Sequence, residues 1–131
     1  MSLIVQKFGG TSVGSVERIQ QVAAKVARFR DEGHDIVVVV SAMSGETNRL
    51  IALAKDIQEQ PTPRELDVLV STGEQVTIAL LCMALHKLGY AAKSYTGAQV
   101  RIITDDAFTK ARIQSIDDAN IRADLDRKSV V

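Results

Sequence analysis

A chain of 131 residues has the length of one domain and can bury a hydrophobic core. With 46% hydrophobic and 24% charged residues, its composition is typical of a soluble globular protein and excludes a disordered or fibrous one. Sixteen basic residues balance sixteen acidic ones, so the charge indicates neither a nucleic acid nor an anionic membrane as partner, and we expect small molecules or other proteins.

Residues 3–8 form the first predicted strand, a β-branched run that ends in two adjacent glycines. Because glycine has no Cβ, Gly9 and Gly10 would let backbone N–H groups approach an anion, and Lys7 would add a positive charge. The lysine precedes the glycines, so the segment is neither a Walker A loop nor a dinucleotide fingerprint. The spacing alone leaves two interpretations open: a phosphate cradle, or a tight turn beside an exposed lysine.

The next elements predict a parallel sheet. Residues 15–32 are apolar at helical spacing, with Ser15 as the expected N-cap and Gly33 just beyond the end. Residues 36–40 are apolar on both faces, as in a central strand covered by helices. Strand, helix and strand together predict a βαβ unit.

A loop of small polar residues, 41–48, follows this second strand. Ligands of open α/β sheets bind at the carboxyl ends of strands, so we expect this loop to converge with the glycine loop. Ser44 or Thr47 could instead cap the next helix, which carries apolar residues from Leu50 to Ile57. Capping explains one hydroxyl but not the whole stretch, and we expect ligand contact.

A long helical segment is predicted from Pro63 to about Leu88, with a capping box at Thr62 and Glu65. We expect an interruption at residues 71–73, after which Glu74 opens the second half. Glu74 is then either a first-turn acid favoured by the helix dipole or a partner for a cationic group of a ligand.

The remaining residues predict further short elements. Residues 117–127 read as a helix with Ile121 and Leu125 facing inward and with Arg122, Asp124 and Asp126 turned towards water. The other expected strands are residues 91–95, 100–104, 111–116 and the beginning of one more at 128–131. Because the chain stops there, we expect part of a larger domain, with an exposed edge after Val131 that invites pairing with another chain.

Metal and redox chemistry are not indicated. Cys82 lies in an apolar helical run and is expected to be a buried thiol, and His34 and His86 have no ligand partners at suitable spacing. Adjacent aspartates at Asp105 and Asp106 are expected to form a turn. With no signal peptide and no apolar run near the ~20 residues of a membrane span, we expect a cytoplasmic protein.

Four segments together closely resemble the bacterial aspartate kinases, which belong to the amino acid kinase family. They begin at Lys7, Val39, Ser71 and Ser94 and read KFGGTS, VVSAMSGETN, STGE and SYTGAQ. Any one of them would be weak evidence, but the combination is specific and the similarity covers essentially the whole chain. The resemblance implies an α/β fold, a three-layer αβα sandwich with a mainly parallel sheet, of which residues 1–131 are the N-terminal portion of the catalytic domain.

The same resemblance implies the reaction and the residues that serve it. The γ-phosphoryl group of ATP would pass to the side-chain carboxylate of L-aspartate and give 4-phospho-L-aspartate, the first step towards lysine, threonine and methionine. Mg²⁺ would be held mainly through the nucleotide phosphates, and no metal-ligating residue is expected in this chain. The implied catalytic residue is Lys7, the implied phosphate-binding residues are Lys7, Phe8, Gly9, Gly10 and Ser41, and the implied substrate-binding residues are Thr47, near the amino acid, and Glu74, on its ammonium group.

The resemblance also implies parts that this sequence does not contain, namely the pocket for the ATP base and the regulatory ACT domains that many relatives carry. Two alternatives follow. The chain could belong to a sister kinase that acts on acetylglutamate, carbamate or a nucleotide, or it could be a catalytically inactive ligand-binding or assembly fragment. We expect a homo-oligomer or pairing with the missing remainder of the enzyme.

Overall fold

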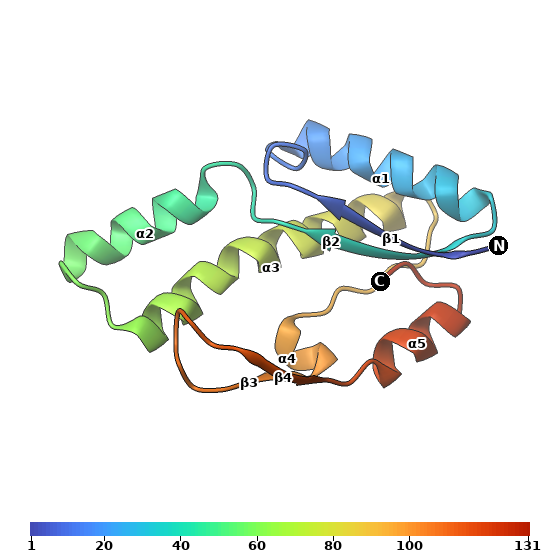
Figure 1. The fold of residues 1–131 in the computed structure, drawn as a ribbon. Coiled ribbons are helices and arrows are strands. Elements are labelled where there is room, and N and C mark those ends of the chain that lie inside the picture. The colour runs from blue at the N-terminus through green and yellow to red at the C-terminus, as the bar shows by residue number, and fades with distance from the viewer.

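The computed structural model describes residues 1–131 as an α/β fold, drawn in Figure 1. The elements in chain order are β1 (Leu3–Phe8), α1 (Val16–Asp31), β2 (Asp35–Val40), α2 (Glu46–Ile57), α3 (Pro63–Lys87), α4 (Gly97–Val100), β3 (Ile102–Thr104), β4 (Ile113–Ile116) and α5 (Ala119–Asp126). The first strand, first helix and second strand lie within one residue of their predicted bounds.

The predicted βαβ unit is confirmed. β1 and β2 pair in parallel, from Leu3 opposite Asp35 to Phe8 opposite Val40, and α1 connects them. The Ser15 hydroxyl accepts a hydrogen bond from the backbone N–H of Arg18 and so caps α1 as expected. This unit places the ends of both strands, and the loops that follow them, at the same edge of the sheet.

The last two residues extend this sheet. Val131 exchanges backbone hydrogen bonds with β2, since its N–H donates to Ile36 and its carbonyl accepts from Val38. On the other side, Val130 donates to the Ala91 carbonyl and accepts from Lys93. The segment therefore lies between β2 and residues 91–93, although the strand predicted to start there is only a single bridge, between Val130 and Ala92. The expected free edge at Val131 is wrong, because both of its sides are already paired.

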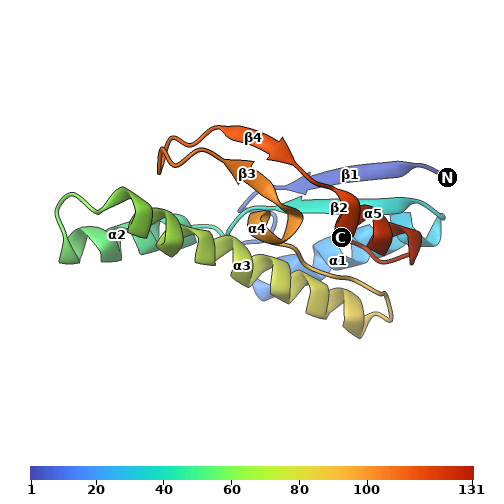
Figure 2. The same cartoon turned by 90° about the horizontal axis from the view of Figure 1, so that it is seen from below.

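α1 and α3 lie on the same side of the sheet, below β1 and β2 in Figure 2, whereas β4 lies on the other side. In Figure 1, α1 lies above β1 and β2 and α5 lies below them, and Figure 2 shows α5 on the near side when the molecule is seen from below. The main core cluster joins α1, β2 and α3; its ten buried members are Val13, Ile19, Val22, Ala23, Val26, Ile36, Val40, Leu81, Leu85 and Val130. The α/β layered architecture is the one the sequence predicts.

α3 is continuous, and the predicted interruption at residues 71–73 is wrong. The hydroxyls of Ser71 and Thr72 donate to the carbonyls of Val68 and Leu69, one turn earlier, so these polar side chains are satisfied within the helix. Glu74 consequently lies in the middle of a helix of 25 residues. A first-turn interaction with the helix dipole no longer explains this carboxylate.

The length of α3 corrects a second expectation. An 18-residue stretch of this helix has a mean hydropathy of 1.7, which by length and composition alone is enough to cross a membrane. The sequence prediction missed it because it divided the segment at residues 71–73. Core helices of soluble proteins pass the same test, and α3 packs against α1 and α2, so this is weak evidence for a span.

Several local predictions in the remaining chain are also corrected. The capping box expected at Thr62 and Glu65 is absent; the Thr62 N–H instead donates to the Gln58 side chain, although Pro63 does begin the helix. Residues 91–95 form only an isolated bridge, at Ala92. Cys82 is half-buried rather than fully buried.

β3 and β4 form a separate antiparallel pair, shorter than the two strands predicted there. The prediction of a helix near the end of the chain is confirmed by α5, but its orientation is partly wrong. Asp124, expected in water, is buried, with an exposed fraction of 5%.

Candidate functional site

The loops that follow β1 and β2 touch, as the sequence predicts. A Cβ on Gly10 would lie 3.0 Å from the carbonyl oxygen of Ala42 and 3.6 Å from the backbone nitrogen of Ser44. The Ser41 N–H donates to the Phe8 carbonyl across 3.2 Å. Any side chain larger than hydrogen at Gly10 would push the two loops apart, so this glycine is required by a close approach.

The glycine loop presents unpaired backbone donors. The N–H groups of Ser12, Val13 and Gly14 close turns onto residues 9–11, whereas those of Gly9, Gly10 and Thr11 donate to no acceptor within the chain. The N–H groups of residues 42–45 in the second loop also have no acceptor. Unpaired amides from two touching loops are the donors that an anion such as a phosphate requires.

Gly45 begins α2 in the left-handed conformation, at φ +82°, and no side chain caps this helix. The alternative in which Ser44 or Thr47 serves as the cap is therefore not supported, and both residues are exposed on the loop and first turn. Glu46 is paired with Arg49, which donates two hydrogen bonds to its carboxylate. These bonds hold the pKa of Glu46 below its ordinary value and keep this acid ionised.

The third motif joins the first two through Ala42. Gly73 of α3 is buried, and a Cβ there would lie 2.9 Å from the Cβ of Ala42. Ala42 thus contacts the glycine loop on one side and α3 on the other. The sequence analysis did not identify Ala42 and Gly73 as packing positions. Their small size in the middle of two polar motifs could have indicated this role. Glu74 is the next residue along α3.

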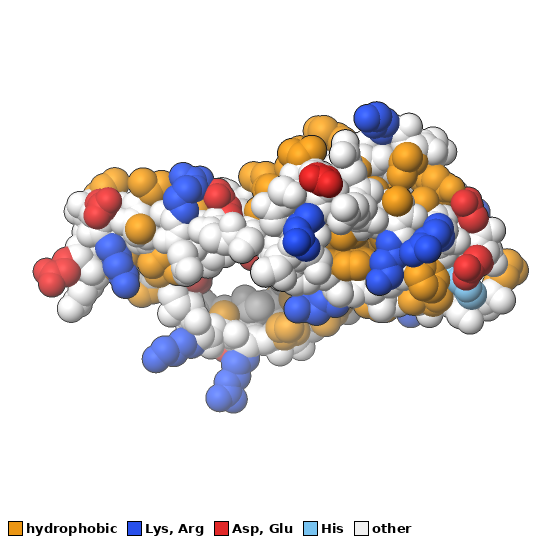
Figure 3. Space-filling model, turned by 90° about the horizontal axis from the view of Figure 1, so that it is seen from above, with side chains coloured by type: hydrophobic (Ala, Val, Ile, Leu, Met, Phe, Trp, Pro, Cys, Tyr) orange, Lys and Arg blue, Asp and Glu red, His pale blue; other side chains and the backbone are white.

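A cavity of about 480 Å³ lies between β2, α3 and residues 93–97. Its wall is mainly apolar, and Glu74 lies on it together with Ser71 and Gln75. Figure 3 shows the surface hollowed between the α2 end and the α1 end of the molecule. Glu74 has no hydrogen-bonded or ionic partner within the chain, so its carboxylate is available to a cationic group.

The structure does not bring every predicted site residue to this cavity. Lys7 is exposed at the end of β1, opposite Val39 in the register, and Thr47 is exposed in the first turn of α2. Phe8, Gly9, Gly10 and Ser41 meet where the two loops touch. Five of the predicted residues therefore lie at two places, a loop junction rich in backbone donors and a cavity edge that carries Glu74, whereas Lys7 and Thr47 are exposed outside the cavity.

Asp105 behaves as a turn former, as predicted. Its carboxylate accepts hydrogen bonds from the backbone N–H groups of Ala107 and Arg112.

The sequence model of the amino acid kinase family matches residues 2–131, and the chain belongs to this family. Within it, the chain is similar over its whole length to aspartokinases: it is 74% identical over 131 residues to the aspartokinase of Pseudomonas aeruginosa.

Solved structures show the same relationship. The crystal structure of aspartate kinase from Synechocystis superposes with a TM-score of 0.81 at 47% identity, over 98% of this chain and 21% of that one. E. coli aspartokinase III, solved in complex with aspartate and ADP, superposes with a TM-score of 0.82 over 99% of this chain and 40% of that one. Its identity is only 21%, and it bears on the fold alone. The chain covers 32% of the length of the Pseudomonas relative.

Proposed function

We propose that this chain supplies the phosphate-binding and amino-acid-binding wall of an aspartate kinase. The complete enzyme transfers the γ-phosphoryl group of ATP to the side-chain carboxylate of L-aspartate, which gives 4-phospho-L-aspartate in the biosynthesis of lysine, threonine and methionine. One observation carries the proposal: three separate motifs, at Gly10, Ala42 and Gly73, are packed into contact around Ala42. The 74% identity with an aspartokinase favours this activity over others in the family.

In this proposal the loop junction binds the phosphates of ATP. The free N–H groups of Gly9 and Gly10 donate to phosphate oxygens, Phe8 anchors the loop by packing against the core, and Ser41 adds a hydroxyl. Lys7 neutralises charge on the transferring phosphoryl group. Phosphoryl transfer depends on positioning and charge stabilisation, and an ionised carboxylate nucleophile needs no general base, so this set of groups suffices.

The amino acid binds beside the phosphates. Glu74 takes its ammonium group, for which an unpaired carboxylate at a cavity edge is suited, and Thr47 contacts it from the first turn of α2. Mg²⁺ would be held mainly by the nucleotide phosphates, where its positive charge would lower the charge that Lys7 must neutralise. The base and ribose of ATP bind to residues outside this chain.

The complete enzyme is proposed to be cytoplasmic and to function as a homo-oligomer, or with this chain paired to the remainder of the catalytic domain. The outer edge of β1 has no strand beside it in the chain, and such an edge can pair with another segment.

A chimera tests the proposal. Residues 1–131 replace the matching segment of the Pseudomonas aeruginosa aspartokinase, and the purified chimera is assayed with ATP and a panel of L-aspartate, N-acetyl-L-glutamate, carbamate and a nucleoside monophosphate. We expect phosphorylation of L-aspartate at a rate near that of the parent enzyme. A folded chimera that prefers another acceptor would establish the sister-kinase alternative instead.

The inactive-fragment alternative is tested on the chain alone. If half of the nucleotide site lies elsewhere, the 131-residue chain should show no ATP-dependent phosphorylation of aspartate under conditions in which the chimera is active. Turnover by the chain alone would refute the claim that the site is incomplete.

A further inference from the structure

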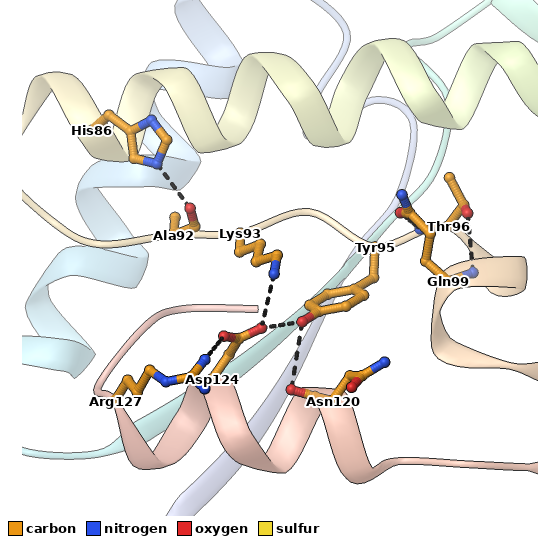
Figure 4. Close-up of polar contacts among 9 residues, drawn as sticks. All are labelled: His86, Ala92, Lys93, Tyr95, Thr96, Gln99, Asn120, Asp124 and Arg127. Atoms are coloured by element: carbon orange, nitrogen blue, oxygen red, sulfur yellow. Dashed lines mark hydrogen bonds and ion pairs between the residues drawn. The ribbon is translucent and has the colours of Figure 1, made fainter.

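Asp124 is a buried carboxylate that the proposed reaction does not use. It lies on α5, and three side chains from two segments converge on it, as Figure 4 shows. The Tyr95 hydroxyl donates a hydrogen bond to it, Arg127 donates from Nη1 across 2.9 Å, and the Lys93 ammonium lies 3.7 Å away. A buried charge needs such partners, because its hydration is lost on folding.

The position of these partners connects Asp124 to the cavity. Residues 93–97, which include Lys93 and Tyr95, form one wall of the cavity, and α3 with Glu74 forms another. In Figure 4, the segment from Ala92 to Thr96 runs between α3 and α5. No regular helix or strand holds residues 93–96, and only a single bridge at Ala92 ties the preceding residues to the sheet. The contacts with Asp124 therefore hold this wall to α5, whose Ile121 also lines the cavity.

The hydrogen bond is favourable to both groups at neutral pH. The bond from Tyr95 is the main cause that lowers the pKa of Asp124, and the adjacent carboxylate raises the pKa of Tyr95. The phenol thus remains a donor and the carboxylate remains an acceptor.

We infer that Asp124, through Tyr95, is a positioning residue that holds the cavity wall formed by residues 93–97 against α3 and so sets the shape of the amino-acid site beside Glu74. This inference rests on the proposed function for its last step, the assignment of the cavity edge to the amino acid. Its first step, that the bond closes the cavity, is independent of any activity.

Cys82 provides the first test. It is the only cysteine of the chain, it lies on the cavity wall, and burial raises the pKa of its thiol. If the Tyr95–Asp124 bond closes the cavity, Tyr95→Phe should let a water-soluble disulfide reagent modify Cys82 at least about threefold faster, since thiol reactivity follows access and thiolate fraction. Asp124→Asn should act in the same direction.

Tyr90→Phe is the matched control. Tyr90 also donates its hydroxyl to an aspartate, Asp31 at the end of α1, and it does not line the cavity. Modification is followed in zero to low urea, because a rate that does not change with urea reports local opening, whereas global unfolding accelerates steeply. Equal rates for wild type, Tyr90→Phe and Tyr95→Phe would overturn the inference.

The second test uses the chimera. Tyr95→Phe should raise the KM for L-aspartate by about tenfold and leave the KM for ATP unchanged, because a displaced wall weakens one substrate only. Tyr90→Phe should change neither constant. Faster modification of Cys82 with an unchanged KM for aspartate would overturn the positioning role. A wild-type chimera without aspartate kinase activity would instead refute the proposed function, and the modification of Cys82 would still decide whether the bond closes the cavity.

Discussion

Lys7 is an exposed cation at the end of β1, and no carboxylate of the chain lies within ion-pair distance of it. Lys25, by contrast, lies over the ring of Phe8, 5.8 Å from its centroid. The two lysines are neighbours of the same loop, but only Lys7 extends from the strand that leads into the glycines. Its freedom from internal pairing is what a group acting on a transferring phosphoryl requires.

Replacing Lys7 by alanine in the chimera should lower kcat by about 10²-fold, because its charge is felt chiefly in the transition state. Steady-state kinetics with ATP and L-aspartate measure the effect. Lys25→Ala is the control and should leave kcat within about twofold. Wild-type turnover by the Lys7 variant would remove this residue from the mechanism.

Replacing Glu74 by glutamine should raise the KM for L-aspartate much more than that for ATP, by about 10-fold or more, since an ammonium group loses its ionic partner. Glu65→Gln, also exposed on α3 but ion-paired with Arg64, is the matched control. Equal losses for both substrates would contradict the ammonium-binding role.

For individual residues, the sequence indicates candidates for the chemistry but not the contacts that pack them together. Gly10 is predicted to be a phosphate-binding residue because paired glycines let backbone N–H groups approach an anion. The contacts of Ala42 with the glycine loop and with α3 could not be predicted, because they depend on how closely segments distant in sequence approach each other. The helical periodicity predicts that Asp124 is exposed to solvent. This is wrong because periodicity within one helix cannot reveal a hydrogen-bond partner as distant in sequence as Tyr95.

Among the elements, α3 differs most from its prediction, and its glycine has a specific role. Glycine usually destabilises the interior of a helix. Gly73, however, is the residue at which α3 touches the loop after β2. The serine, threonine and glycine that predicted a break are instead accommodated by hydrogen bonds to the preceding turn and by close packing. Here the tertiary contact with Ala42 outweighs the low helix propensity of glycine.

Gly73→Ala should therefore destabilise the protein, although alanine favours a helix by about 1 kcal/mol, because the new methyl overlaps Ala42 at a cost of about 1–3 kcal/mol. Thermal unfolding should show a lower Tm. Gly97→Ala, where a Cβ would meet no atom within 4 Å, is the control and should not lower the Tm. Adding Ala42→Gly to the Gly73 variant should restore part of the loss; a Gly73 variant as stable as the wild type would contradict the contact.

The attachment of α5 should depend on pH. The hydrogen bond from Tyr95 lowers the pKa of Asp124 in the folded state from its ordinary value of 3.8. The stabilisation from this carboxylate is thus fully present above that value and is lost as the pH falls through the lower pKa of the folded state. Urea unfolding at pH 6 and at pH 3 should show a smaller stability difference between wild type and Asp124→Asn at pH 3. A difference that is the same at both pH values would contradict the ionised pair.

For the whole molecule, the first helix was predictable because its apolar residues recur at helical spacing, and the two strands because they are short β-branched apolar runs. The place of Val130 and Val131 between β2 and residues 91–93 was not, because sheet order depends on contacts distant in sequence. The fold contains a loop junction with unpaired backbone amides and a cavity that carries Glu74, and the chain spans 32% of the length of its Pseudomonas relative. These features agree with one wall of a kinase site that is completed by other residues.

The decisive measurement is the formation of 4-phospho-L-aspartate from ATP and L-aspartate, compared between the chimera and the 131-residue chain alone. We expect the chimera to be active with aspartate and the chain alone to be inactive. A correctly folded chimera that forms no phosphoaspartate, under conditions in which the Pseudomonas parent does, would contradict the proposed function.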